Sequence, residues 1–280
     1  MLSSEQRGQF ERDGFIVIPG FKSMEEIARL RERAAQIVDQ FDADQSRHIF
    51  TTQNQEAATD QYFLGSDNTI RCFFEEEAFD ENGRLRQAKA LSINKIGHAV
   101  HDLDPVFDAF SRGAALDAVA RGLGLTEPLV WQSMYIFKQP GIGGEVRWHQ
   151  DATFFDTAPV SVTTFWFALE DATIDNGCLW VEPGGHRGPM RERFLRNGDA
   201  IRMEKLDTTP WPGDEVAVPL EAKAGSLVCF HGLLPHYSAP NRSPVSRHAY
   251  TLHVTDKRTA YSPQNWIQRD SRLPARGFLP

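Results

Sequence analysis

A short segment, residues 143–151, contains two potential metal ligands two positions apart. It ends in His149, Gln150 and Asp151. On a β-strand, residues two apart point to the same face, so the imidazole of His149 and the carboxylate of Asp151 would converge. These are two of the three ligands of a 2-His-1-carboxylate iron site. The pair therefore favours a β-framework in which a distant strand brings a second histidine to the same point.

The pair alone is not specific. The chain has nine His and 38 acidic residues in 280 positions, so about one His-x-acid pair is expected by chance. It becomes informative only if a third ligand and an anchor for a co-substrate accompany it.

Composition limits the class of protein. A chain of 280 residues, 41% hydrophobic, can bury one large core, and no repeat or linker divides it. We therefore expect a single domain, residues 1–280. A net charge of −8 argues against nucleic acid and anionic membranes as partners. The oligomeric state is left open, a monomer being the simplest expectation.

Cysteine usage and the N-terminus bear on the compartment. Cys72, Cys178 and Cys229 are an odd number without a CxxC spacing, which is typical of thiols in a reducing compartment. We see neither a signal-peptide pattern nor an apolar run long enough to span a membrane. The expected location is the cytoplasm.

The N-terminal half combines helical patterns with a long irregular stretch. Residues 4–12 indicate a short helix, residues 15–18 a strand, and Ser23 with Glu26 a capping box before an apolar helical stripe. Residues 105–124 also indicate a helix. Between them, residues 42–90 mix polar tracts with aromatic patches. Such a stretch is either a lid or binding loop, or an elaborated surface loop, and the pattern does not separate the two.

The second half is rich in strands. Apolar, β-branched runs at 130–137, 160–169, 178–181, 226–230 and 249–254 are separated by Pro and Gly turns. Helices followed by many short strands predict a mainly β fold, a cupin-like jelly roll with N-terminal helices packed on the sheet. The helical part is expected at about 1–128 and the jelly-roll core at about 129–256.

Two histidines compete as the third ligand. His231 ends an apolar strand, whereas His236 begins the next turn, and local pattern does not choose between them. Arg247 follows at the start of a strand whose alternation is informative. If its small and polar face points inward, Arg247 enters the interior near the metal, where it would need an anionic partner such as a dicarboxylate. The face that carries Arg247 continues with Ala249, Thr251 and His253.

Several separated runs resemble the phytanoyl-CoA dioxygenase family. They are HQD at 149–151, CLWVEPGGH at 178–186, and His236 with Ser238 and Arg247. Three more runs resemble one subgroup of that family: SINKIGHA at 92–99, QSMYIFKQP at 132–140 and SPQNW at 262–266. The resemblance extends from about residue 10 to residue 266, nearly the whole chain.

This resemblance implies a non-haem dioxygenase on a double-stranded β-helix that uses Fe(II), 2-oxoglutarate and O2. His149, Asp151 and His236 match the family's iron ligands, which would leave His231 a structural or supporting role. Ser238 and Arg247 match the pair that holds the distal carboxylate of 2-oxoglutarate. Further positions that match the co-substrate site, or lie within the metal motif, are Lys95, Met134, Trp166 and Gln150.

Three functions compete. The first is hydroxylation of a small organic substrate with release of succinate and CO2. The second is a sensor that binds iron and 2-oxoglutarate with little turnover. The third is a zinc or manganese cupin that hydrolyses or isomerises, although Arg247 and Ser238 favour the first two because a hydrolase needs no dicarboxylate anchor.

Residues outside these motifs receive weaker interpretations. Substrate-pocket candidates are Trp148, Phe154, Phe155, Arg71, Phe74 and Arg147. The histidines assigned to structure or surface are His48, His98, His101, His186, His248 and His253.

Overall fold

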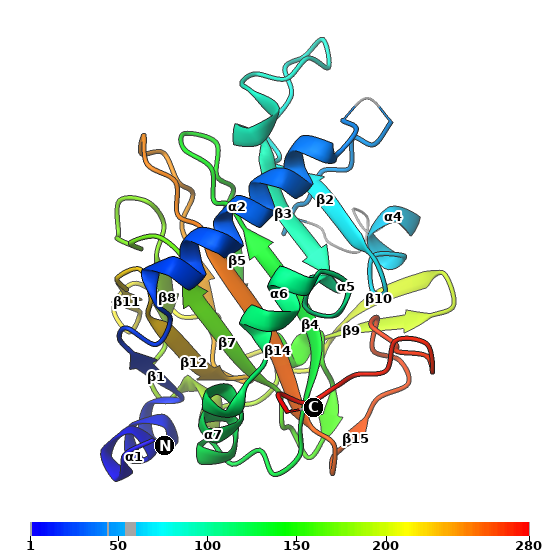
Figure 1. Cartoon of the computed structure of the whole chain (residues 1–280). Coiled ribbons are helices and arrows are strands. Elements are labelled where there is room, and N and C mark those ends of the chain that lie inside the picture. The colour runs from blue at the N-terminus through cyan, green and yellow to red at the C-terminus, as the bar shows by residue number, and fades with distance from the viewer. Residues whose placement is uncertain (1, 44, 54–59, 280) are drawn as a thin grey trace.

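Two antiparallel sheets form the framework of the protein. The computed structural model describes residues 2–43, 45–53 and 60–279 (Figure 1). The larger sheet has seven strands in the order β1-β12-β7-β14-β4-β3-β2. Their bounds are β1 (Phe15–Ile18), β12 (Leu227–His231), β7 (Thr163–Ala168), β14 (Ala249–Asp256), β4 (Pro128–Ile136), β3 (Ile93–His98) and β2 (Ile70–Phe74).

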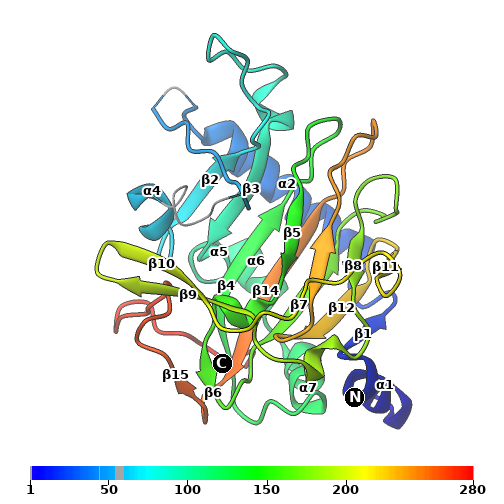
Figure 2. The same cartoon turned by 180° about the vertical axis from the view of Figure 1, so that it is seen from behind.

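The smaller sheet has four strands in the order β11-β8-β13-β5. Its members are β11 (Val218–Leu220), β8 (Leu179–Val181), β13 (His236–Ser238) and β5 (Val146–His149). Figure 2, seen from the side opposite to Figure 1, shows β5, β8 and β11 in front of the larger sheet. Two short ribbons complete the described strands: β9 (Glu192–Asn197) with β10 (Ala200–Lys205), and β6 (Thr157–Ala158) with β15 (Ala260–Tyr261). Two facing sheets of this kind make the predicted jelly roll.

Helices cover the other face of the larger sheet. The longest, α2 (Met24–Gln40), crosses that face together with α5 (Val100–Leu103), α6 (Pro105–Ser111) and α7 (Ala114–Gly122) (Figure 1). Ser23 and Glu26 form the predicted capping box at the start of α2. Its buried stripe packs in one core cluster with Tyr250 and Leu252 of β14. The remaining helical segments in the described part of the chain are α1 (Ser4–Asp13), α4 (Gln61–Leu64), η1 (Lys89–Leu91), η2 (Asp151–Thr153) and η3 (Gly185–Arg187).

The fold class is confirmed, but two details of the prediction are wrong. The helix predicted over 105–124 is broken into α6 and α7 at Gly113, whose φ of 122° is unfavourable for other residues. The division at about residue 128 does not describe the sheet, since β1, β2 and β3 precede it. The sequence of a short apolar segment such as Ile70–Phe74 does not reveal which distant strand it will pair with.

The irregular stretch 42–90 is only partly a loop. Its aromatic patch Phe73–Phe74 belongs to β2, while Phe50, Thr52 and Phe63 line the pocket described below. Residues 44 and 54–59, which include part of the predicted polar tract, lie outside the described residues. Among the residues that are described, no helix combines the length and apolar character needed to cross a bilayer.

Candidate metal centre and co-substrate pocket

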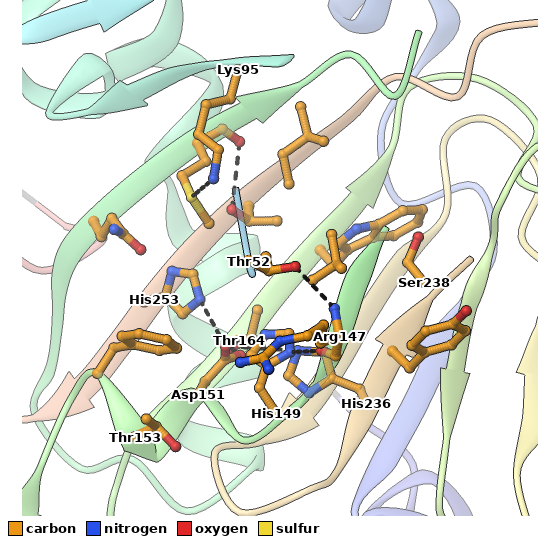
Figure 3. Close-up of a pocket in the computed structure, with 18 of the residues that line it drawn as sticks. Thr52, Lys95, Arg147, His149, Asp151, Thr153, Thr164, His236, Ser238 and His253 are labelled. Carbon is orange, nitrogen blue, oxygen red and sulfur yellow. Dashed lines mark hydrogen bonds and ion pairs between the residues drawn. The ribbon is translucent and has the colours of Figure 1, made fainter. Parts of the chain in front are cut away.

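The predicted metal motif and one distant histidine converge between the sheets. His149 ends β5 and His236 begins β13, and the two residues are paired directly across these antiparallel strands. Asp151 begins η2, and its Oδ1 lies 3.7 Å from Nε2 of each histidine. One ligand atom from each of the three residues lies within 4.8 Å of the others. The cluster is thus compact enough to hold one metal ion (Figure 3).

Hydrogen bonds orient the two imidazoles before any metal binds. Nδ1 of His149 lies 2.8 Å from the carbonyl oxygen of Arg147, and Nδ1 of His236 lies 3.0 Å from that of Leu234. A carbonyl oxygen only accepts, so each Nδ1 must carry the proton and each Nε2 presents a lone pair. This arrangement is typical of histidine metal ligands.

The charge state of the cluster suits a cation. Burial and the neighbouring His236 together lower the pKa of His149 to about 3, although Asp151 partly offsets them, so the ring is neutral at physiological pH. Burial alone would raise the pKa of Asp151, but the imidazoles of His236, His253 and His149 hold it below its ordinary value. Neutral imidazoles and an ionised carboxylate are the protonation states that metal binding requires.

A buried arginine lines the same pocket as this cluster. The side chain of Arg247 is 2% exposed, its Nε donates to Gly177 O at 3.0 Å, and its Nη2 donates to Ser238 Oγ at 3.1 Å. Its guanidinium carbon lies 5.4 Å from the ring centre of Trp166. Nη1 is buried without a hydrogen-bond partner among the described residues. A guanidinium in this position has an unused donor for a carboxylate.

Lys95 and Met134 line another part of the same pocket. Nζ of Lys95 lies 3.6 Å from Met134 Sδ and 3.1 Å from the ring centre of Phe50. Burial lowers the pKa of Lys95 to about 7, although Glu75 partly offsets that effect. Lys95, Met134, Trp166, Ser238 and Arg247 all line the same pocket as the metal cluster. The structure therefore brings these predicted positions together.

Aromatic side chains form part of the pocket lining, and Phe63, Phe154, Phe155 and Trp266 are called the aromatic wall below. The empty space of the pocket, counted out to and including the open mouth, is about 1140 Å³. Of the pocket candidates, Trp148, Phe154, Phe155 and Arg147 line it. Arg71 and Phe74 do not: Arg71 lies over the Tyr62 ring, and Phe74 is buried in the core.

Two other placements differ from the sequence-based interpretation. Gln150 does not line the pocket, because its amide donates to Pro189 O and Leu233 O and its oxygen accepts from Arg191 N. Its side chain instead connects the loops that contain Pro189, Arg191 and Leu233. His98 and His253, which were assigned to structure or surface, both line the pocket. For His253 a signal existed, since it shares the inward parity of Arg247 on its strand.

His231 lies outside the cluster. It ends β12, its Nδ1 accepts from Leu233 N at 3.0 Å, and its ring packs near Phe10 and His186. The choice that sequence pattern left open between His231 and His236 is thereby resolved in geometry.

Comparison with known proteins agrees with this site. Residues 10–249 match the family model described as phytanoyl-CoA dioxygenase (PhyH). The chain belongs to the phytanoyl-CoA dioxygenase family. Members of this family are dioxygenases that use Fe(II), 2-oxoglutarate and O2, and the His-Asp-His cluster fits that chemistry.

Several relatives within the family cover almost the whole chain. Phytanoyl-CoA dioxygenase 1 of Oryza sativa subsp. japonica is 48% identical, covering 96% of this chain and 94% of its own. Phytanoyl-CoA dioxygenase of Arabidopsis thaliana is 47% identical, covering 98% and 95%. Phytanoyl-CoA dioxygenase domain-containing protein 1 of Bos taurus is 43% identical, covering 98% and 97%. The predicted resemblance is confirmed.

Solved structures share the fold at lower identity. The non-heme alpha ketoglutarate dependent carbocyclase SnoK from nogalamycin biosynthesis has a TM-score of 0.65 at 19% identity, covering 98% of this chain and 92% of its own. EctD from S. alaskensis, in its apoform, has a TM-score of 0.63 at 21% identity, covering 98% and 84%. These likenesses support the jelly-roll architecture.

The residues fit both groups that the family uses, Fe(II) and 2-oxoglutarate. Three neutral or anionic ligand atoms converge on one point, as a facial iron site requires. The unpartnered Nη1 of Arg247 supplies a fixed cationic donor for a second carboxylate in the same pocket.

Proposed function

We propose that this protein hydroxylates a small organic substrate, converting 2-oxoglutarate and O2 into succinate and CO2. In this proposal His149, Asp151 and His236 hold the iron, and Arg247 with Ser238 holds the distal carboxylate of 2-oxoglutarate. The observation that carries it is the buried, unpartnered Nη1 of Arg247 in the same pocket as the His-Asp-His cluster. The side chains proposed to complete the co-substrate site are Lys95, Met134 and Trp166.

The chemistry divides between the cofactor and the protein. Bound Fe(II), with 2-oxoglutarate, supplies the oxidising power that unactivated carbon requires. The protein residues fix geometry and charge. The Nδ1 hydrogen bonds of His149 and His236 keep Nε2 directed inward, and the ionised Asp151 would offset part of the charge of the metal. Arg247 fixes the direction in which the co-substrate lies.

The aromatic wall supports a small, partly apolar substrate. Phe63, Phe154, Phe155 and Trp266 line the pocket, and the Phe155 ring stacks on that of His253. Such a wall excludes water from the reacting centre and orients an apolar skeleton. We propose that the substrate is held here, between the metal and the pocket mouth.

The compartment is part of the proposal. The three cysteines are free and buried, which supports a reducing compartment such as the cytoplasm.

Succinate release tests the proposal. The protein is loaded anaerobically with Fe(II) and 2-oxoglutarate, exposed to O2, and screened against fractions of a metabolite extract. A fraction that stimulates succinate formation, with a product heavier by one oxygen atom, supports hydroxylation. The Asp151→Ala variant is the matched control and should give no stimulation. Binding of both ligands with no stimulated succinate in any fraction would instead favour the sensor hypothesis.

A further inference from the structure

His253 places a third imidazole beside the proposed metal cluster. It lies on β14, its exposed fraction is 3%, and its ring stacks on that of Phe155 with centroids 4.8 Å apart. Its Nε2 lies 3.4 Å from Oδ1 of Asp151 (Figure 3). That oxygen is the one that lies 3.7 Å from Nε2 of both His149 and His236.

The other oxygen of the same carboxylate is also held. Thr164 Oγ1 donates a hydrogen bond to Oδ2 of Asp151. Thr164 and His253 are directly paired residues of the neighbouring strands β7 and β14. A single cross-strand pair therefore contacts both carboxylate oxygens, one from each strand.

The hydrogen-bonding groups assign the direction of the contact. An ionised carboxylate only accepts, so Nε2 of His253 faces Asp151 as an N–H donor. Nδ1 of His253 is buried and has no hydrogen-bond partner among the described residues, so no second hydrogen bond fixes the ring. Stacking on Phe155 and the contact with Asp151 are what orient it. The 3.4 Å between His253 Nε2 and Asp151 Oδ1 exceeds the optimum for an N–H···O hydrogen bond. The contact is therefore weak, and its main effect is on the orientation of the carboxylate.

We propose that His253 is a positioning residue for the metal centre. With Thr164, it holds the Asp151 carboxylate in the rotation that presents Oδ1, and only Oδ1, toward His149 and His236. A carboxylate free to rotate could offer both oxygens to the metal and occupy a position needed by 2-oxoglutarate. This inference rests on the proposed iron site.

Two polar substitutions of similar size separate the hydrogen bond from packing. In His253→Gln the side-chain amide reaches the former Nε2 position, whereas in His253→Asn it reaches only the Nδ1 position. Thr164→Val removes the hydrogen bond to the other oxygen with little change in shape. His231→Asn is the matched control, because this imidazole lies outside the pocket.

The experiment measures Fe(II) affinity without O2, by quenching of tryptophan fluorescence, and the visible absorption of the Fe(II)–2-oxoglutarate complex. H253N and T164V should bind Fe(II) about 10- to 100-fold more weakly than the wild type and show a shifted absorption band. H253Q should bind within a few-fold of the wild type, as should H231N. Circular dichroism checks that each variant is folded.

Other outcomes overturn the inference. Wild-type affinity and absorption in H253N would show that His253 does not position Asp151. Equal losses in H253Q and H253N, with an unshifted band, would assign His253 a packing role only. Failure of the iron site itself has a different signature, because the wild type would then bind no Fe(II), or His149→Ala would bind it unchanged.

Discussion

His149 and His236 sit directly opposite each other on the antiparallel strands β5 and β13, with ring centroids 4.0 Å apart. Cross-strand neighbours are the closest side chains that a sheet can bring together from distant parts of a chain. Asp151, just beyond the end of β5, closes the triangle. The site therefore depends on one strand pairing in the smaller sheet.

Each residue of this triangle should be indispensable. His149→Ala, Asp151→Ala and His236→Ala are each expected to abolish turnover while leaving the fold intact, because a facial triad missing one ligand loses both affinity and geometry. The measurements are Fe(II) binding and 2-oxoglutarate-dependent succinate formation. His231→Ala is the control and should bind iron. Loss of iron binding in His231→Ala with retention in His236→Ala would refute the assignment of the third ligand.

Removing the buried guanidinium of Arg247 should weaken the binding of 2-oxoglutarate more than the binding of iron. Arg247→Ala is expected to raise the KM for 2-oxoglutarate by an amount equivalent to about 2–5 kcal/mol, since one partner of a buried charge pair is lost. Iron affinity should change little, because the three ligands remain. Arg242→Ala, which removes an exposed arginine paired with Glu77, is the control and should leave the KM unchanged. An unchanged KM in Arg247→Ala would rule out its role as anchor.

The affinity for 2-oxoglutarate should depend on pH through Lys95. Its pKa of about 7 means that the amine is cationic below pH 7 and loses its charge as the pH rises. A cation attracts the dianionic co-substrate, so the Kd for 2-oxoglutarate should increase between about pH 6 and pH 8. Calorimetric titration over this range measures the effect. The slope should vanish in Lys95→Met, and a slope that persists in this variant would assign the pH dependence to another group.

The C-terminal tail should contribute strongly to stability. Phe278 is fully buried, and its ring centroid lies 5.4 Å from that of Phe165 in β7. Phe278→Ala is expected to lower the free energy of unfolding by about 3–5 kcal/mol through lost burial and a residual cavity. The neighbouring Leu279 is 46% exposed, so Leu279→Ala should stay within about 0.5 kcal/mol of the wild type. Urea unfolding followed by circular dichroism compares the two, and equal effects would contradict the structural account.

The family name should not be taken as the substrate. The segment 42–90, which supplies Phe50, Thr52 and Phe63 to the pocket, has ten acidic and five basic residues, two of the acidic ones lying outside the described residues. Averaged over the segment, that balance repels a polyphosphate such as coenzyme A. We therefore expect a neutral, cationic or modestly anionic substrate.

A panel of acyl-CoAs, their free acids and amine-bearing analogues tests this expectation through 2-oxoglutarate decarboxylation. The free acids or amines should stimulate succinate formation more than the thioesters. Hydroxylation of an acyl-CoA whose free acid is inert would show that the expectation is wrong.

Part of this protein follows from local pattern. The capping box at Ser23 and Glu26 and the apolar stripe after it predicted α2, because helix formation depends on residues three and four apart. The alternation after Arg247 placed it on the same strand face as Ala249, Thr251 and His253, because strand side chains alternate strictly. The strand-rich second half predicted a jelly roll, and the separated motifs predicted the family. Each of these predictions depends on residues that are close together in the sequence, or on short motifs that occur in a fixed order.

The arrangement of the site is a different matter, because it depends on contacts between distant segments. Local pattern did not choose between His231 and His236, yet only His236 pairs with His149, since the turn between β12 and β13 takes the chain from the larger sheet to the smaller one. Gln150 points behind the motif because loops from residues 189–191 and 233 accept and donate there. His253 reaches Asp151 only because β7 and β14 are in register at Thr164. Residue order determined which side chains were available for chemistry, and the pairing of strands far apart in the chain decided which of them meet.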